Sequence, residues 1–492
     1  MFISAFIMRK QTKILVATAL LALGASFTSM AAAKTGTWML EDDGWYCYDK
    51  EGEAYEDEFC LSYGKEYYMG DDGLMVTNSW VEHDENMYYV GSDGSKTIND
   101  WRFVLPEDAD EDEDAEWFYF GSKGAMVKSA KKVIDGKTYY FKDNGVMLTG
   151  WVNTTEFDEA NDVDGAVYCD ENGARVASQW IKVWAPGTDE DEAEEDDKNW
   201  YWIKSKGAAQ IGRNLDINGQ TYFFDEDGVM LSGWVALVGE DYVALENAIS
   251  TSGASAVYFC GNSDQGWAKK NTWIKTWDPE NYEDADADVT QKWYWIAKSG
   301  KVYVPAAEDA SAADAMTFAD GSADVPFTCT GSDATMMALK EINDKTYAFN
   351  AEGQMLDGLV RVEGTDMMYF GGADDGAMKT GAQTIEDEEG NDYKFFFGKK
   401  TTDDGYVEGV GVNGAVSGEL YKNGLIQTAD DAYEVITVGE YDYIVDEDGD
   451  IRTSKKDYEN EDDVVVVPAK TEGWEFNPNS GVEKGSIVYP EA

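Results

Sequence analysis

Hydrophobic and polar positions follow one another in short blocks along this chain. A typical block has three aromatic residues, a polar stretch ending in Gly and a second apolar stretch, as in YYFKDNG followed by VMLTGW at residues 139–151. Aromatic residues favour extended strands, and a polar stretch that ends in Gly is typical of a tight turn. We therefore expect each block to form a β-hairpin of about twenty residues, with VMLTGW as the return strand.

The block is repeated along the sequence. GKTYYFKDNGVMLTGW (Gly136–Trp151) returns as GQTYFFDEDGVMLSGW (Gly219–Trp234), and weaker copies cover most of residues 36–381. Pairs of turn glycines lie 21 residues apart at four places: Gly52 and Gly73, Gly73 and Gly94, Gly124 and Gly145, and Gly207 and Gly228. One hairpin cannot bury its apolar face in water, so successive hairpins must stack. The sequence thus predicts an all-β fold, a repeat β-hairpin solenoid wound into a superhelix, with acidic loop insertions.

A longer unit is superimposed on the short one. Residues 99–124, 178–207 and 271–300 share a Trp-led strand, a Pro, an acidic run and the next group of aromatic residues. The module has therefore been copied in blocks of several repeats. We expect the acidic inserts to interrupt the regular stacking, so that fewer ligand sites than repeats are competent.

Aromatic side chains are expected on both faces of the strands, because successive residues of a strand point to opposite sides. One set fills the interior, and we interpret any single Tyr or Phe first as a core residue. The tryptophans favour a second interpretation, since many of them fall at hairpin ends: Trp80, Trp101, Trp151, Trp180, Trp234 and Trp273. A Trp that faces aromatic residues of the next hairpin forms a box suited to a quaternary ammonium group or to a sugar face.

The motif at Gly136–Trp151 resembles the cell-wall-binding, choline-binding-type repeat of Gram-positive surface proteins. Similar repeats occur in glucan-binding domains of glucosyltransferases and in clostridial toxins. The resemblance implies ligand sites that combine aromatic residues of two adjacent hairpins with a Met. Carried onto this chain, the candidate ligand-binding residues are Tyr139, Tyr140, Met147, Trp151, Tyr222, Phe223, Met230 and Trp234, with Trp117, Trp200 and Trp293 as the first aromatic of their units. Val167 and Cys169 replace aromatic residues of the pattern.

The first residues indicate export. Basic residues at Arg9, Lys10 and Lys13 precede an apolar run from Ile14 to Phe27 and then a small-residue stretch at residues 31–33. This order is typical of a secretory signal peptide, and the apolar run is short for a membrane anchor. We expect residues 1–33 to be removed, leaving a secreted or cell-surface protein of a Gram-positive bacterium with no membrane span.

Charge and chemistry narrow the functions further. With 97 acidic and 39 basic residues the chain carries a formal charge of -58, which repels nucleic acid and attracts cations. The single histidine, His83, leaves no His-dependent triad or His-rich zinc site within one chain, and no carboxylate pair stands out, so we expect no enzyme. The acidic runs lack the full spacing of a calcium loop, so we expect neither metal nor cofactor. Cys47, Cys169 and Cys260 occupy aromatic slots of the repeat and are interpreted as small apolar strand residues, with Cys47 and Cys60 as the only close pair in sequence.

The expected organisation is a signal peptide at 1–33, cell-wall-binding-type repeats at 34–301, an irregular linker or insertion at 302–340, further repeats at 341–381, and degenerate β repeats with a C-terminal tail at 382–492. The expected function is non-catalytic binding to a cell-wall polymer, either choline-bearing teichoic acid or a glucan. A passive surface-coat protein whose aromatics serve only as core is the alternative of another class. Self-association is left open.

Overall fold

The structure is a computed structural model. It describes residues 32–110, 113–189, 192–282, 290–306, 311–318, 327–329, 335–362, 366–372, 374–387, 390–402, 406–454, 456–460, 462–468 and 475–487. The predicted signal peptide lies almost wholly outside these residues. Their regular elements are strands apart from three short 3-10 helices, η1 (Glu195–Asp197), η2 (Ile249–Thr251) and η3 (Pro279–Asn281). None of the described helices has the length and apolar character needed to cross a membrane.

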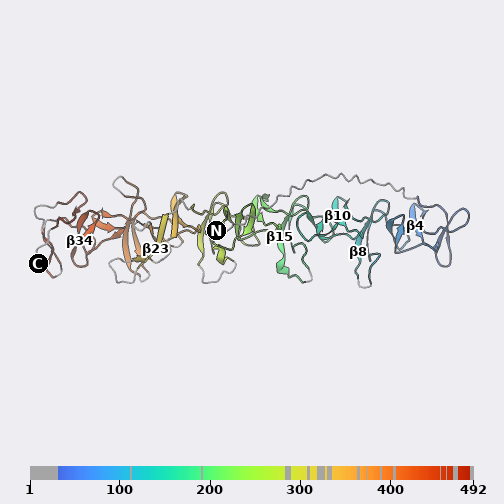
Figure 1. Ribbon diagram of the computed structural model, residues 1–492, viewed down its shortest axis with the longest axis horizontal. Helices are drawn as coiled ribbons and strands as arrows, with labels where there is room; N and C mark the ends of the chain where they lie inside the picture. The colour runs from blue at the N-terminus through green and yellow to red at the C-terminus, as the bar shows by residue number, and fades with distance from the viewer. Residues whose placement is uncertain are drawn as a thin grey trace, which may run out of the picture. The chain divides into compact units, whose positions relative to one another are not determined.

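The chain divides into two compact units. Unit 1 comprises the residues up to Asn161 together with Gly165–Val176, and unit 2 comprises Asp162–Asp164 and Ala177–Ala492. Figure 1 shows hairpins following one another within each unit, with β4, β8 and β10 in unit 1 and β15, β23 and β34 in unit 2. The strands of unit 1 are β1 (Thr37–Leu40), β2 (Trp45–Tyr48), β3 (Glu58–Ser62), β4 (Lys65–Met69), β5 (Ser79–His83), β6 (Asn86–Val90), β7 (Asp100–Val104), β8 (Glu116–Phe120), β9 (Ala130–Ile134), β10 (Lys137–Phe141), β11 (Gly150–Asn153), β12 (Asp158–Glu159) and β13 (Ala166–Cys169).

Unit 2 continues the same antiparallel pattern with larger sheets toward its end. Its first strands are β14 (Gln179–Val183), β15 (Asn199–Ile203), β16 (Gly212–Ile217), β17 (Gln220–Phe224), β18 (Trp234–Val238), β19 (Asp241–Ala244), β20 (Ala256–Phe259), β21 (Thr272–Thr276) and β22 (Lys292–Ile296). A six-stranded sheet follows, made of β23 (Ser311–Phe318), β24 (Phe327–Cys329), β25 (Thr335–Ile342), β26 (Lys345–Asn350), β27 (Leu359–Val362) and β28 (Asp366–Tyr369). A five-stranded sheet contains β29 (Gly381–Glu386), β30 (Asp392–Phe397), β31 (Gly414–Val416), β32 (Glu419–Lys422) and β33 (Leu425–Ile426). The last strands are β34 (Tyr433–Val438), β35 (Tyr441–Asp446), β36 (Tyr458–Glu459), β37 (Val465–Val467) and β38 (Val482–Glu483).

The hairpins are paired differently from the sequence prediction. The aromatic strand β10 pairs with β9, which precedes it, whereas VMLTGW provides only an isolated bridge between Phe141 and Met147 before β11 starts the next hairpin. The turn between β9 and β10 consists of Asp135 and Gly136, whose φ values are +48° and +81°. Two successive residues with positive φ form the type I′ turn that matches the twist of paired strands. The predicted return strand was therefore wrong.

The turn that ends in Gly instead connects one hairpin to the next. In this connection the Met147 N–H donates to the Trp117 carbonyl of the preceding hairpin at 2.9 Å, and the Met126 N–H donates likewise to Met87 at 2.8 Å. The Met side chain then covers the turn glycine of the following repeat. A Cβ added to Gly145 would lie 2.4 Å from the Met126 sulfur, and one at Gly173 would lie 2.3 Å from the Met147 sulfur. Each connection thus joins neighbouring hairpins through both backbone and side chain.

The acidic runs fall in the sequence between the paired strands of three hairpins. They connect β7 to β8, β14 to β15, and β21 to β22, and these strand pairs keep an uninterrupted register. Residues 111–112 of the first run, residues 190–191 of the second and all acidic residues of the third lie outside the described residues. The expectation that the inserts interrupt the stacking was wrong, because each of these hairpins still packs against a following hairpin of the same unit, as described below.

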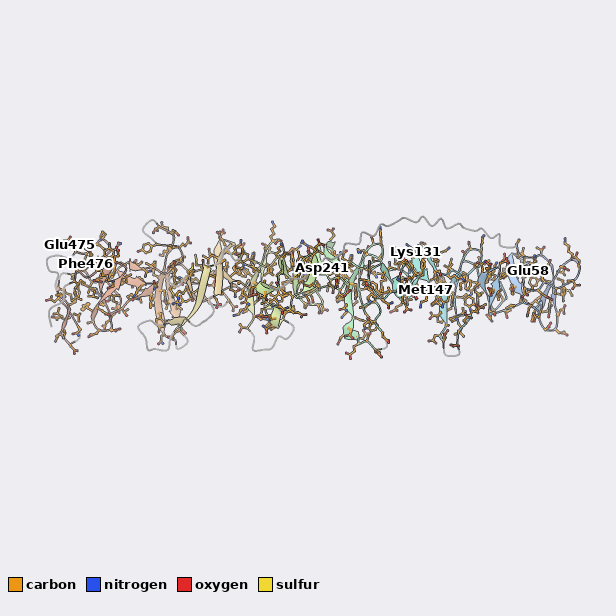
Figure 2. The ribbon with its side chains drawn as sticks, viewed as in Figure 1. Glu58, Lys131, Met147, Asp241, Glu475 and Phe476 are labelled. Atoms are coloured by element: carbon orange, nitrogen blue, oxygen red, sulfur yellow. The ribbon has the colours of Figure 1, made fainter. Side chains whose placement is uncertain are left out.

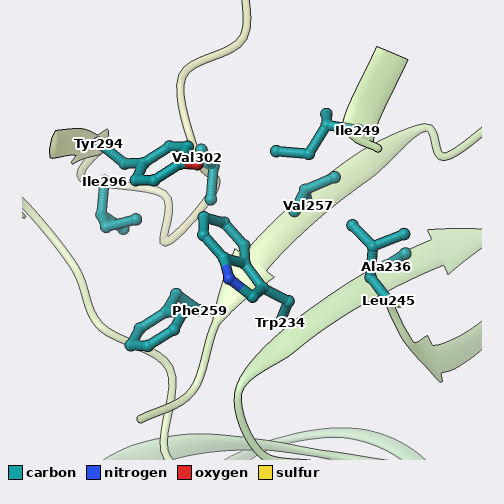
Figure 3. Close-up of a cluster of buried hydrophobic side chains, with 9 residues drawn as sticks. All are labelled: Trp234, Ala236, Leu245, Ile249, Val257, Phe259, Tyr294, Ile296 and Val302. Carbon is teal, nitrogen blue, oxygen red and sulfur yellow. The ribbon is translucent and has the colours of Figure 1, made fainter. Parts of the chain in front are cut away.

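The apolar residues are buried in many small clusters rather than in one core. Figure 3 shows one of them, in which the indole of Trp234 lies among Val257, Phe259, Tyr294 and other buried side chains. Each cluster joins two or three hairpins, as expected when stability comes from contacts between neighbours. The predicted fold class, an all-β repeat of stacked hairpins with acidic loops, is confirmed.

Candidate aromatic ligand sites

Three tryptophans of the long repeats form aromatic boxes with the same construction. The first, box 101, contains Trp101 with Trp117 and Tyr119 from its own hairpin and Tyr139 and Phe141 from the next one. The ring centroid of Trp101 lies 5.0 Å from those of Tyr119 and Tyr139, 5.8 Å from Phe141 and 6.4 Å from Trp117. Its contact with Tyr139 is edge-to-face. Trp117 is 43% exposed, so the box is open to solvent on that side.

Boxes 180 and 273 belong to unit 2. Box 180 consists of Trp180, Trp200, Trp202, Tyr222 and Phe224. Box 273 consists of Trp273, Trp293, Trp295, Tyr347 and Phe349. The distance from the central Trp to the nearer aromatic of the next hairpin is 4.8 Å in both boxes. In box 273 that next hairpin is β25–β26, so the intervening strands β23 and β24 leave the aromatic contact intact.

Strand register explains why these residues meet. Trp101 pairs with Tyr119, Trp180 with Trp202, and Trp273 with Trp295. Residues two positions apart share a face of a strand, so Trp117, Trp200 and Trp293 lie on the same face as these partners. The same alternation brings Tyr139 with Phe141, Tyr222 with Phe224, and Tyr347 with Phe349 to the neighbouring wall. Figure 2 shows how densely side chains fill both units along their length.

Other predicted residues lie outside these three boxes. Trp80 contacts Tyr89, Phe118 and Phe120 and donates its indole N–H to the Leu105 carbonyl at 2.8 Å. Trp151 is 8% exposed and packs edge-to-face on Tyr168, and Trp234 is 2% exposed. Tyr140 and Phe223 are buried in other clusters. The two predicted methionines, in contrast, pack against boxes: Met147 lies in one cluster with Tyr119, Phe141 and Trp101, and Met230 packs beside Tyr222 and Phe224 of box 180.

Carboxylates lie near the two tyrosines of box 101. Burial raises the pKa of Tyr119, and the carboxylates of Asp135 and Asp100 raise it further. Burial likewise raises the pKa of Tyr139, with Asp170 and Asp135 adding to the effect. Both hydroxyls therefore stay neutral at physiological pH, and the nearby carboxylates favour a cation over an anion.

Box 273 already contains an ammonium group of the protein. Lys275 lies over the Trp293 ring, with its Nζ 5.7 Å from the ring centroid. Asp374 Oδ1 accepts hydrogen bonds from Lys275 Nζ at 2.6 Å and from the Trp293 indole N–H at 3.1 Å. The corresponding position in box 101 is Phe103, which packs on Trp117 at 5.1 Å. Among the described residues, no ammonium or guanidinium group is placed over a ring of box 101 or box 180.

A fourth aromatic group, near the start of unit 1, also surrounds a lysine. Lys96 Nζ lies 4.5 Å from the ring centroid of Phe59 and 5.2 Å from that of Tyr88, and it forms an ion pair with Glu66. Only 6% of the Lys96 side chain is exposed. Lys96 occupies the position that Met126 and Met147 hold in later connections, and its stem covers Gly124 as Met126 covers Gly145. A cation can therefore lie between aromatic rings of two hairpins of this protein.

Chemical labelling should report this enclosed ammonium group. We expect reductive methylation of the folded chain to modify Lys96 at least about ten times more slowly than Lys65, because a reagent reaches a buried amine only when the structure opens locally. Lys65 is a matched control, since it also forms an ion pair, with Asp93, but its side chain is 56% exposed. Peptide mass spectrometry measures both rates. Equal rates would contradict the enclosed position of Lys96.

About half of the residues in boxes 101, 180 and 273 were not predicted from the sequence. Trp202, Trp295, Tyr119, Phe141, Phe224, Tyr347 and Phe349 were not among the candidates. The signal was available, because Tyr347 is the first aromatic of its strand and each of the other six lies two positions after such a residue. A search for groups that could hold a metal ion gives none among the described residues.

Family models match three stretches of the chain. Residues 63–95 and 129–180 match choline-binding repeats, and residues 215–230 match a putative cell wall binding repeat. These stretches include β4–β6, β9–β13, the end of β16 and β17.

Curated relatives are similar over larger parts of the chain. Glucosyltransferase-S of Streptococcus mutans is 29% identical over 160 residues, which are 32% of this chain and 9% of the relative. Glucosyltransferase-I of Streptococcus downei is 24% identical over 361 residues, which are 69% of this chain and 20% of the relative. The chain thus spans a fifth or less of the length of the curated relatives that it matches.

Two solved structures show similar chains. CbpJ from Streptococcus pneumoniae has 18% identity and a TM-score of 0.39, and the match covers 68% of this chain and 98% of that one. Choline binding protein F from Streptococcus pneumoniae has 16% identity and a TM-score of 0.29, with coverage of 75% and 98%. Three stretches of the chain therefore match choline-binding and cell-wall-binding repeats.

Proposed function

We propose that the protein is exported and non-catalytic, and that box 101 and box 180 attach it to the cell wall by binding choline groups of teichoic acid. The observation that carries this proposal is the construction of the boxes. Each has a central Trp between two aromatic residues of its own hairpin and two of the next, and one side of box 101 is open at Trp117. A trimethylammonium group is attracted to several ring faces at once by cation–π interactions.

The size of the cation–π contributions indicates that each box alone binds choline weakly. Each ring face contributes about 0.5–2 kcal/mol to binding a cation, which after the cost of association corresponds to a Kd of roughly 1 mM for each box. Several boxes on one chain raise the overall affinity for a polymer with many choline groups, because the second contact is intramolecular. The carboxylates beside Tyr119 and Tyr139 favour the cation and oppose the phosphate of the same polymer. Because the carboxylates attract the ammonium group and repel the phosphate, we expect the polymer to be bound through its ammonium groups alone.

A neutral glucan is the second candidate ligand. It is favoured by the match of 69% of this chain to glucosyltransferase-I. Sugar rings stack on tryptophan faces without a requirement for charge, so the acidic surface is neutral toward this ligand.

The test is a titration of the full chain labelled with 5-fluorotryptophan, followed by ¹⁹F NMR so that individual tryptophans report separately. We expect choline to shift the Trp101, Trp117, Trp180 and Trp200 signals in a saturable way. The Trp117→Ala variant should lose about tenfold in affinity at box 101, since one cation–π contact is worth about 1.4 kcal/mol. Trp45→Ala is the matched control, because Trp45 is 42% exposed and belongs to none of the three boxes.

Two parallel titrants separate the alternatives. The uncharged choline isostere 3,3-dimethyl-1-butanol should bind much more weakly than choline, because it lacks the positive charge that the rings and carboxylates attract. Dextran oligosaccharides test the glucan. A response to dextran without a response to choline would show that the boxes bind a glucan and not choline. If neither choline nor dextran shifted the signals, the aromatic residues of the boxes would serve only in packing.

A further inference from the structure

Two cysteines from neighbouring hairpins lie together in unit 1. Cys47 is on β2 and Cys60 is on β3, so they belong to different hairpins. Both are fully buried in one small cluster with Met69. Both are free thiols, and their side chains pack in this same cluster. From the sequence alone we could say only that the two cysteines lie near each other along the chain.

The backbone around this pair is fixed from both sides. The Lys34 N–H donates to the Phe59 carbonyl at 2.6 Å, and the Leu61 N–H donates to the Lys34 carbonyl at 2.8 Å, which places residues 34–36 beside Cys60. A Cβ added to Gly36 would lie 2.8 Å from the Cys47 sulfur, so the Cys47 thiol points at the same segment. The packing of both cysteines beside residues 34–36 is therefore a consequence of how the first two hairpins pair.

We propose that Cys47 and Cys60 form a disulfide that joins hairpin β1–β2 to hairpin β3–β4. The inference rests on the proposed export, because such bonds persist in oxidising surroundings outside the cell. Both thiols lose a proton, the two sulfurs form one bond, and two electrons pass to a low-molecular-weight disulfide, which is reduced to two thiols. Cys169 and Cys260 lie in separate clusters that contain no other described cysteine, so they stay reduced.

Burial determines when the bond forms. It raises the pKa of both thiols, and only the thiolate attacks a disulfide, so exchange in the folded protein is slow. The bond therefore forms while the two hairpins assemble and then resists reduction. Once formed, it keeps the first hairpin attached when local openings separate β1–β2 from its neighbour.

The experiment refolds the full chain from denaturant with a mixture of reduced and oxidised glutathione, and then alkylates the remaining thiols under denaturing conditions. Trypsin cleaves after Lys34, Lys50 and Lys65, so Cys47 and Cys60 fall on separate peptides, residues 35–50 and 51–65. We expect mass spectrometry without reductant to find these two peptides linked in most chains, while the Cys169 and Cys260 peptides are alkylated. Hydrogen exchange should show protection of the β1–β2 amides falling at least about tenfold in the reduced chain.

Two cysteine variants test whether the linked peptides come from a Cys47–Cys60 disulfide. Cys60→Ala should lose the linked peptide, and Cys169→Ala should keep it. Recovery of peptides 35–50 and 51–65 unlinked and alkylated after refolding would overturn the proposal, as would a link from Cys47 to any other cysteine. Neither result depends on choline, so the proposal can fail while the choline titration succeeds, and the reverse.

Discussion

Replacement of Trp234 by Ala is expected to unfold the hairpins around it, at a cost of about 3–5 kcal/mol. The indole is 2% exposed, and its ring centroid lies 4.8 Å from Tyr294 and 5.2 Å from Phe259. Its N–H donates to the Trp277 carbonyl at 2.9 Å. The variant thus leaves a large cavity and also removes the hydrogen bond to that carbonyl. Hydrogen exchange of the amides in β18, β20 and β22 measures the loss locally.

A matched substitution shows whether Trp234 acts through packing. Trp117→Ala removes the same side chain from a position that is 43% exposed, and it should change stability by about 1 kcal/mol or less. Trp117→Ala should weaken choline binding at box 101 with the fold intact, whereas Trp234→Ala should lose the fold of its own cluster. If Trp234→Ala kept its amide protection and lost only ligand binding, Trp234 would be a ligand residue as the sequence suggested.

The second large effect is expected at a turn glycine. Gly145→Ala should destabilise its connection by about 2–4 kcal/mol, because a strained backbone and an overpacked contact add together. Gly145 has a φ of +87°, and a Cβ there would lie 2.4 Å from the Met126 sulfur and 2.7 Å from its terminal methyl. Guanidinium unfolding followed by tyrosine and tryptophan fluorescence measures the difference from wild type.

Gly136→Ala isolates the backbone part of that cost. Gly136 has a φ of +81°, but a Cβ there would meet nothing within 4 Å, so about 1–2 kcal/mol is expected. Combining Gly145→Ala with Met126→Ala should restore part of the lost stability, because the clashing side chain is gone. A double-mutant cycle gives this coupling directly. Equal losses at Gly145 and Gly136, with no coupling to Met126, would show that the Met does not press on the turn.

The sequence predicted the class of fold but not which strands pair. The repeat has two Gly-containing turns, one at Asp135-Gly136 and one ending at Gly145, and a period of 21 residues permits the aromatic strand to pair with either neighbour. Asn218-Gly219 was the informative signal, because Asn-Gly between two strands strongly favours a two-residue hairpin. Both of its φ values are positive in the structure, at +51° and +75°. Only contacts between neighbouring strands decide between the two pairings.

The candidate residues were predicted with similar limits. Residue type identified tryptophan as the centre of a box, and Trp101, Trp180 and Trp273 do occupy such centres. It did not distinguish them from Trp234, which has the same sequence context but is enclosed by Val257, Phe259 and Tyr294. The difference arises from the residues around the ring, which are Val257 and Phe259 of the paired strand β20 and Tyr294 of the next hairpin. A motif that describes one hairpin has no information about its neighbour.

The sharing of each box between consecutive hairpins has a consequence for how such a gene changes. Recombination between two copies of the repeat removes or adds whole hairpins, and it joins the Trp of one copy to the Tyr and Phe of another. Because the three long repeats place their Trp half and the following Tyr and Phe half in the same phase, a junction between two of them produces a complete box with halves from different copies. The number of sites can therefore vary between strains by one at a time, while an insertion that is out of phase by a few residues would leave two half-boxes without partners.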